Sequence, residues 1–163
     1  MEITIKNFEN HFQKLMINLP KWSKKEYDVT KLKQVPVIIC FLQFKDKFLL
    51  LKRSDKVISG NGLWSTLAGH YDELKPVEEI LKKELQEELG VETDIIKQLI
   101  KGKISIVETD GKIFVSQLFL AKLKDKIIPK LDFEHTEFGW FTLEEIKNLN
   151  TYPKLEDNLK SFL

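Results

Sequence analysis

Cysteine and arginine are scarce in this 163-residue sequence, and each shortage excludes something. Cys40 is the only cysteine, so the chain can have neither an internal disulfide nor a zinc site built from several cysteines. Arg53 is the only arginine among 26 basic residues. If an arginine holds a phosphate in the bidentate way, Arg53 must supply that contact.

Excess charge and long apolar runs are also missing. The formal net charge is +1, so no broad basic field favours nucleic acid or a membrane surface as a partner. No uninterrupted apolar run is long enough to span a bilayer. Residues 1–6 lack the charged-then-apolar layout of a signal peptide. We therefore expect a soluble, cytoplasmic protein with one globular core.

The most informative stretch covers residues 69–91. Its second half predicts an amphipathic helix, because apolar residues recur every fourth position at Val77, Leu81, Leu85 and Leu89. Pro76 suits the first helical position, where its missing N–H costs nothing. Gly90 suits the position just after the helix, where a left-handed residue is favoured.

Three carboxylates lie on the polar side of this predicted helix. Glu84, Glu87 and Glu88 occupy positions i, i+3 and i+4, so they face the same way. Like charges at this spacing destabilise a helix by about 0.2–0.5 kcal/mol per pair. A hard divalent cation would offset that repulsion, since such ions bind carboxylate oxygens. A solvated acidic face is the alternative that the three residues alone leave open.

The whole stretch resembles the Nudix box of the Nudix hydrolase family, G-x5-E-x7-R-E-U-x-E-E-x-G-U, where U is aliphatic. Gly69 matches the first glycine with no insertion before the rest of the motif. The end of the motif is matched by Glu84, Leu85, Glu87, Glu88, Gly90 and Val91. The resemblance implies an α/β/α sandwich with a mixed central sheet. It assigns residues 35–163 to a Nudix domain and residues 1–34 to an N-terminal extension of helix and loop.

Two fixed positions of the motif differ. Lys75 replaces the family's glutamate, and Lys83 replaces its arginine. In the family these two residues help to fix the loop to the helix and to aim the metal-binding glutamates. We therefore expect this ion pair to be missing, with Glu79, one turn before Lys83, as a partial substitute. Lys83 keeps the positive charge without the planar fork of arginine.

The rest of the chain predicts further elements. Five apolar residues at helical spacing indicate a short N-terminal helix ended by Pro20: Phe8, Phe12, Leu15, Met16 and Leu19. The sequence leaves three roles open for this helix: packing against the core, shaping a substrate pocket, or making a dimer contact.

The later part of the chain predicts strands and a further helix. Residues 35–44 and 48–51 predict two strands joined by a turn. A loose strand over residues 95–107, interrupted at Gly102, precedes an Asp-Gly hairpin turn at residues 109–112. A returning strand covers residues 113–123, and a capping box at Thr142 and Glu145 begins a helix that reaches about Leu149.

The resemblance also implies a chemistry. Glu84, Glu87 and Glu88, with the Gly69 carbonyl, would hold Mg²⁺ or Mn²⁺, which oxygen-only ligands favour over zinc. The reaction would be metal-dependent hydrolysis of a diphosphate linkage in a nucleoside diphosphate derivative. The general base would be Glu84 or a late acidic residue, Glu134 or Glu137, and Glu87 is expected to be essential. Arg53 is the candidate substrate-binding residue.

Two other functions stay open at this point. A Nudix-fold binding or regulatory module without activity is suggested by Lys75 and Lys83. An isopentenyl-diphosphate-isomerase-like protein is a weaker alternative, because that chemistry uses an active-site cysteine and Cys40 lies well before the box. In each case the expected partner is a small-molecule diphosphate, and a homodimer is an open expectation.

Overall fold

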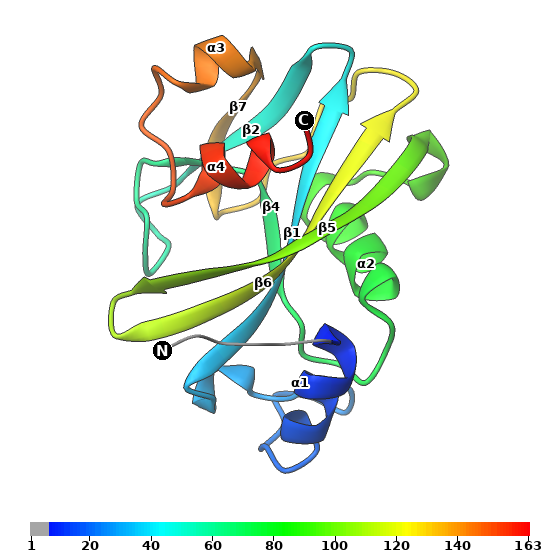
Figure 1. Cartoon of the computed structure of the whole chain (residues 1–163), viewed down its shortest axis with the longest axis vertical. Helices are drawn as coiled ribbons and strands as arrows, with labels where there is room; N and C mark the ends of the chain where they lie inside the picture. Colours follow the sequence, from blue (N-terminus) through cyan, green and yellow to red (C-terminus); the bar gives the residue numbers. More distant parts are fainter. Residues whose placement is uncertain (1–6) are drawn as a thin grey trace.

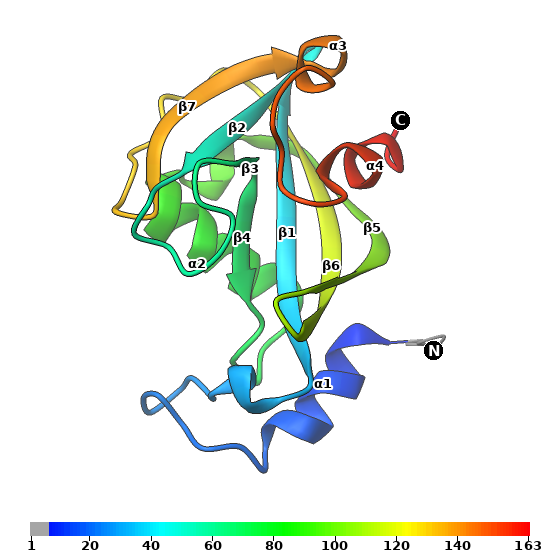
Figure 2. The same cartoon turned by 90° about the vertical axis from the view of Figure 1, so that its left-hand side faces the viewer.

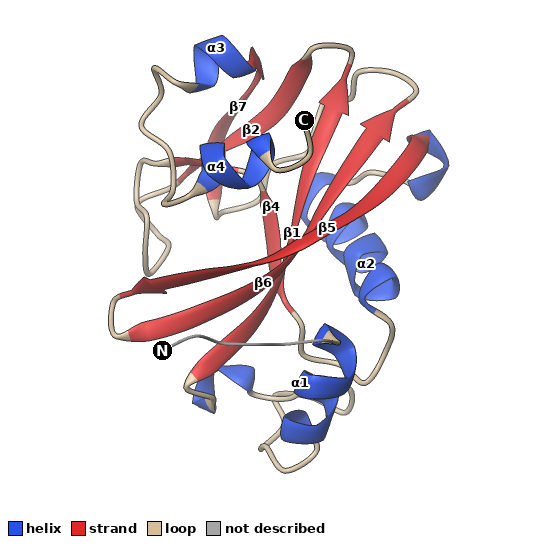
Figure 3. Cartoon of the chain, viewed as in Figure 1, coloured by secondary structure: helices blue, strands red, loops and turns tan. Residues whose placement is uncertain are grey.

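A mixed sheet of seven strands forms the centre of the computed structural model, which describes residues 7–163 (Figures 1 and 3). The expectation about a signal peptide therefore falls outside the described residues. The strands are β1 (Gln34–Phe44), β2 (Lys47–Arg53), β3 (Trp64–Ser65), β4 (Leu67–His70), β5 (Ile96–Thr109), β6 (Lys112–Leu123) and β7 (His135–Thr142). The helices are α1 (Phe8–Met16), α2 (Val77–Leu89), α3 (Leu143–Ile146) and α4 (Leu155–Lys160), with 3₁₀ turns η1 (Val29–Lys31) and η2 (Thr93–Ile95).

Strand β1 organises the sheet. It pairs in parallel with β6 along one edge, while β2 and β4 share its other edge in antiparallel pairing. β5 extends the sheet beyond β6, and β7 pairs with β2. The β5–β6 turn has positive φ at Asp110 (52°) and Gly111 (73°), the left-handed backbone expected of an Asp-Gly hairpin. The predicted hairpin is confirmed.

Helices cover both faces of the sheet, as Figure 2 shows from the side. Because successive strand residues point to opposite faces, β1 serves two cores. Ile38 and Cys40 belong to the larger core with α1 and α2. Phe41 belongs to a smaller core with residues of α3 and α4. The predicted α/β/α arrangement with a mixed sheet is therefore confirmed.

Helix α2 occupies the predicted residues and buries its apolar stripe. Val77, Ile80, Leu81, Leu85 and Leu89 are all buried. Gly90 ends the helix with φ of 65°, and its N–H donates back to the last turn. Pro76 is the residue before the helix rather than its first helical residue, with an extended ψ of 145°. It has no side-chain acceptor with which to cap the helix.

Helix α1 packs into the same core as α2. Phe8, Phe12 and Met16 are buried there, which confirms the packing role that its apolar spacing predicts. Its N-terminus is capped by Asn7, whose side chain accepts from the Asn10 N–H at 3.0 Å. The first element of the chain is thus joined to the box helix through a shared core.

Several local features differ from the sequence-based prediction. α1 ends at Met16 and does not reach Pro20. β3 and β4 were not predicted, because two and four residues are too few to show a period. β5 continues through Gly102 as a bulge, where an added Cβ would lie 2.5 Å from Phe162 Cζ. α3 ends at Ile146 instead of about Leu149, although its predicted capping box at Thr142 and Glu145 is present.

Candidate active site

A cleft of about 790 Å³ lies beside β1 and the second half of α2, which contributes Glu84 and Glu88. Its polar part is lined by Glu84, Glu88 and Glu134 together with Arg53. Its apolar part is lined by side chains of the sheet and the C-terminal segment: Val35, Val37, Ile39, Phe41, Phe114 and Leu155. The cleft thus combines a charged end with an apolar floor large enough for a small molecule.

Gly69 allows Glu84 to enter this cleft. β4 pairs with β1 so that Gly69 lies opposite Ile38, and this register fixes the glycine beneath α2. A Cβ built on Gly69 would lie 2.6 Å from Glu84 Oε1, too close for any side chain. The glycine is required here for close approach and not for a special φ.

Glu84 and Glu88, one helical turn apart, form a pair of poorly solvated carboxyl groups that resists full ionisation. Burial is the main cause that raises the pKa of Glu84 to about 7 and that of Glu88 to about 9. A hydrogen bond between the two carboxyl groups lowers the pKa of Glu84 and raises that of Glu88, and neighbouring charge raises both, from Glu87 for Glu84 and from Glu84 for Glu88. Glu88 Oε2 is buried without a hydrogen-bond partner among the residues that the structure describes. A divalent cation bound here would stabilise the ionised carboxylates and would take the unpartnered Glu88 oxygen as a ligand. The residues present therefore fit Mg²⁺ or Mn²⁺.

Glu87 lies on an adjacent part of the helix surface. Its side chain is exposed and lines a separate hollow with Glu73, Lys75 and Lys83. Its charge still acts on Glu84, whose pKa it helps to raise after burial. The structure thus brings Glu84 and Glu88 to the cleft, whereas Glu87, next to Glu88 in the sequence, lines the separate hollow.

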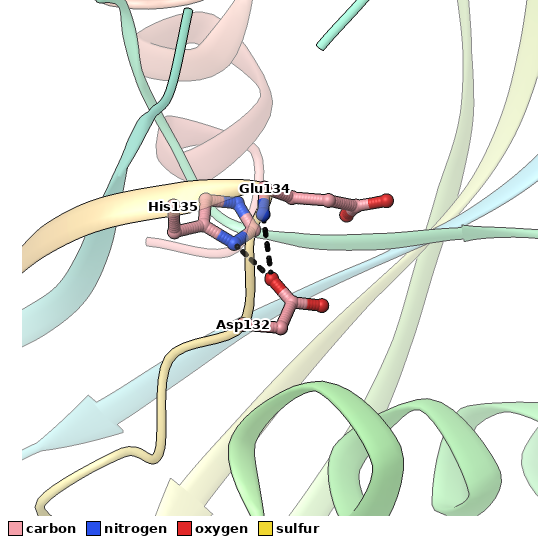
Figure 4. Close-up of side chains that lie close together, drawn as sticks. All are labelled: Asp132, Glu134 and His135. Atoms are coloured by element: carbon pink, nitrogen blue, oxygen red, sulfur yellow. Dashed lines mark hydrogen bonds and ion pairs between the residues drawn. The ribbon is translucent and has the colours of Figure 1, made fainter. Parts of the chain in front are cut away.

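A short segment before β7 brings Glu134 to the cleft, and Figure 4 shows this residue with its neighbours Asp132 and His135. The Glu134 N–H donates to Asp132 Oδ1 at 3.0 Å, and His135 Nδ1 lies 3.6 Å from the same oxygen. Ser54, directly after β2, holds this segment in place, because its backbone N–H donates to the Glu134 carbonyl at 2.7 Å. Burial raises the pKa of Glu134, Asp132 adds to the rise, and Arg53 opposes it.

Of the two late candidates for the general base, only Glu134 lines the cleft in the described part of the chain. Glu137 is exposed on β7 opposite Lys52, and their charged atoms lie 3.8 Å apart. Glu134 lies in the segment before β7, whereas Glu137 lies within the strand, paired with Lys52 of β2.

Arg53 is held at the cleft by two contacts. Its Nε donates to the Ser59 carbonyl at 2.9 Å, and its guanidinium lies over the Tyr152 ring, 5.5 Å from the centroid. Gly60 packs closely against both residues, since a Cβ there would lie 2.6 Å from Tyr152 Cε2 and 3.1 Å from Arg53 Nε. The remaining N–H groups of the guanidinium are available to an anionic ligand.

A family model described as the NUDIX domain matches residues 32–162. The chain belongs to the Nudix family. A search of curated proteins gives no match. Among solved structures, a MutT NUDIX hydrolase from Burkholderia pseudomallei is similar, with a TM-score of 0.69 and 22% identity over 80% of this chain and 98% of that one.

Two other solved structures share the Nudix fold. A Caenorhabditis elegans Ap4A hydrolase, in a binary complex, has a TM-score of 0.65 and 24% identity over 78% of this chain and 94% of its own. The NUDIX domain of Shewanella oneidensis NrtR, complexed with ADP ribose, has a TM-score of 0.67 and 17% identity over 83% and 91%. At these identities the likeness shows a common fold.

The loop of the Nudix box is fixed to its helix in an unexpected way. An ion pair between loop and helix is made by Glu73, which is only 3% exposed. Glu73 Oε2 lies 3.1 Å from Lys83 Nζ, and Glu73 Oε1 lies 3.6 Å from Lys75 Nζ. The family's pair between positions 75 and 83 is absent, as expected, but the loop is still joined to the helix by a carboxylate two residues before Lys75, which the motif's fixed positions do not include.

The second partner of Lys83 also differs from expectation. Glu26, in the segment before β1, lies 3.9 Å from Lys83 Nζ. Glu79 makes no ion pair with Lys83 in the described residues. Glu26 could not be found from the sequence, because the contact joins positions far apart in the chain.

None of the helices between residues 7 and 163 is both long and apolar enough to cross a bilayer. The Nudix match begins at residue 32, so α1 and the segment after it precede the matched region.

Proposed function

We propose that this Nudix protein hydrolyses a diphosphate linkage in a nucleoside diphosphate derivative, using Mg²⁺ or Mn²⁺ held by Glu84, Glu87, Glu88 and the Gly69 carbonyl. The observation that carries the proposal is the Glu84–Glu88 pair. It combines two poorly solvated carboxylates, a buried oxygen without a partner, and a position in the cleft. Such a pair is costly to ionise fully unless a cation neutralises it.

The bound ion would neutralise phosphate charge and lower the pKa of the attacking water. Arg53 would hold a phosphate oxygen, oriented by Ser59 and Tyr152. A carboxylate, Glu84 or Glu134, would accept a proton from the water as its oxygen bonds to phosphorus. The phosphorus–oxygen bond of the linkage then breaks, and the leaving phosphate takes the electron pair. The exposed position of Glu137 weighs against it as the base.

The apolar floor supports a substrate with a nucleoside or another aromatic part. The Ap4A hydrolase and the NrtR domain with ADP ribose are proteins of this fold whose names refer to diphosphate-containing nucleotides. A substrate of this class would place its phosphates near Arg53 and the glutamates and its base near Phe114. A homodimer and a cytoplasmic location stay predictions.

The test is a screen of nucleotide sugars, dinucleoside polyphosphates, oxidised nucleotides and capped RNA with each metal. We expect metal-dependent release of a phosphate product from at least one class, and loss of that activity in Glu87→Gln. No turnover across the panel with either metal would contradict the proposal.

The same screen decides the two alternatives. A binding module would show ligand-dependent thermal stabilisation without turnover; its motivation is weakened because Glu73 supplies the loop-to-helix ion pair. Isomerase-like chemistry would need an accessible thiolate. Cys40 is fully buried in the larger core, and burial raises the pKa of its thiol to about 12.

A further inference from the structure

We propose that the segment before the Nudix match, residues 7–31, positions the metal-binding glutamates; we call it the N-terminal arm. This inference rests on the proposed metal site and goes beyond it, because it concerns contacts of the arm with the loop and the helix start and not with a metal ligand. The arm acts on the loop of residues 71–76 and on the start of α2, which the loop joins to Gly69.

The first contact caps the box helix. Because Pro76 precedes α2 and has no acceptor side chain, the helix cannot satisfy its first N–H groups in the usual way. Glu9 of α1 supplies the missing acceptor: its Oε1 accepts from the Val77 N–H at 2.7 Å. A carboxylate is also the favoured charge at a helix N-terminus. The cap of the box helix thus comes from another helix 68 residues away in the sequence.

Two further contacts hold the loop itself. Gln13 Nε2 donates to the Tyr71 hydroxyl at 2.8 Å, and the Tyr27 N–H donates to the Asp72 carbonyl at 2.8 Å. Tyr71 is fully buried, its hydroxyl donates to the Lys75 carbonyl, and its ring lies 5.4 Å from that of Phe8. The arm therefore contacts the loop along most of its length.

The last contact reaches the residue beside the first metal-binding glutamate. Lys83 directly precedes Glu84, and its Nζ lies between the buried Glu73 of the loop and Glu26 of the arm. Since α2 is a single helix, fixing Val77 and Lys83 fixes the position of the carboxylates that follow. Little error is tolerated, because Glu84 already lies against Gly69 with no room for one extra carbon.

The test uses the full chain and four variants. Glu9→Ala removes the cap, whereas Glu9→Gln keeps an oxygen that can accept the Val77 N–H. Gln13→Ala removes the contact with Tyr71 and leaves the helix start intact. Glu79→Ala is the matched control, because Glu79 is exposed and lies in the same first turn of α2 without a hydrogen bond from its side chain in the described structure.

The readouts are Mn²⁺ affinity by calorimetry or electron paramagnetic resonance, hydrogen exchange over residues 71–88, and kcat and KM. We expect Glu9→Ala to weaken Mn²⁺ binding about fivefold, as the loss of one helix cap would. It should speed exchange in the first turn of α2 and lower kcat more than KM. Gln13→Ala should act in the same direction, while Glu9→Gln and Glu79→Ala should stay within twofold of the wild type.

Unchanged Mn²⁺ affinity in both Glu9→Ala and Gln13→Ala would overturn the inference, even if both variants melt earlier, because the arm would then only stabilise the fold. A wild type that binds Mn²⁺ but hydrolyses nothing would contradict the proposed function instead, and the affinities would still decide the role of the arm. A wild type that does not bind Mn²⁺ would overturn both.

Discussion

Glu84 occupies the space that any side chain at position 69 would need. The closest carboxylate oxygen would lie 2.6 Å from a Cβ on Gly69, and because β4 is held in register with β1, it is the Glu84 side chain that would have to move. The glycine at the start of the Nudix box thus has a steric reason, which is the placement of the first glutamate of the candidate metal site.

Replacement of Gly69 should therefore act on the metal site. We expect Gly69→Ala to displace Glu84 and to weaken Mn²⁺ binding by at least about tenfold, or about 1.4 kcal/mol. Gly102→Ala is the matched control: its Cβ would also collide, 2.5 Å from Phe162 Cζ, but away from the cleft. It should lower the melting temperature and leave Mn²⁺ affinity unchanged. Equal Mn²⁺ affinities in the two variants would contradict this interpretation of Gly69.

The Glu84–Glu88 pair predicts how stability depends on pH without metal. Burial raises the pKa of both groups, so the folded state holds more protons than the unfolded state at neutral pH. Stability should then be greatest below the usual carboxyl pKa and should fall as pH rises through about 7 and about 9.

This dependence can be measured by thermal melts between pH 5 and 9 in chelator. Glu88→Gln should flatten the decline, and added Mg²⁺ should raise the wild-type melting temperature most at the alkaline end. If the metal-free stability of the wild type rose steadily toward pH 9, Glu84 and Glu88 would not be poorly solvated, and the interpretation of this pair would be contradicted.

The ion pair between Glu73 and Lys83 should contribute to stability through its buried carboxylate. We expect Lys83→Met to destabilise the fold by about 1–3 kcal/mol, because Glu73 would lose its closer cationic partner. Lys83→Arg should retain most of the stability. Lys82→Met is the control, since Lys82 is the exposed neighbour of Lys83 on the same helix. Chemical unfolding of the three variants checks this, and it fails if the two methionine variants are equally stable.

The two late glutamates should differ in their effect on catalysis. Glu134 lines the cleft, whereas Glu137 pairs with Lys52 at the surface. We expect Glu134→Gln to lower kcat by at least about tenfold, toward the hundredfold or more typical of a lost general base, and to alter the pH profile of kcat. Glu137→Gln should stay within twofold. The reverse order of the two variants would contradict this assignment.

Much of the box could be predicted from the sequence because its signals are local. The stripe of Val77 and Leu85, the left-handed Gly90 and the spacing of the glutamates are all set within a few turns of one helix. The Asp110–Gly111 turn is local in the same sense. Such features follow from backbone preferences and side-chain periodicity, which a sequence shows directly.

The remaining features depend on contacts between distant residues. The cap that Glu9 gives to Val77 joins α1 to α2, and the pairing of Glu26 with Lys83 joins the arm to the box. The separation of Glu134 from Glu137 depends on how β7 pairs with β2. No period or short motif encodes these contacts, so only the folded chain shows them.

The candidate metal site is tested most directly by a titration of the metal-free protein with Mn²⁺, comparing the wild type with Glu88→Gln. We expect saturable binding to the wild type that Glu88→Gln weakens at least about tenfold, since a ligand and half of the carboxyl pair are lost. A wild type that does not bind Mn²⁺, or a Glu88→Gln variant that binds it equally well, would contradict the proposed site.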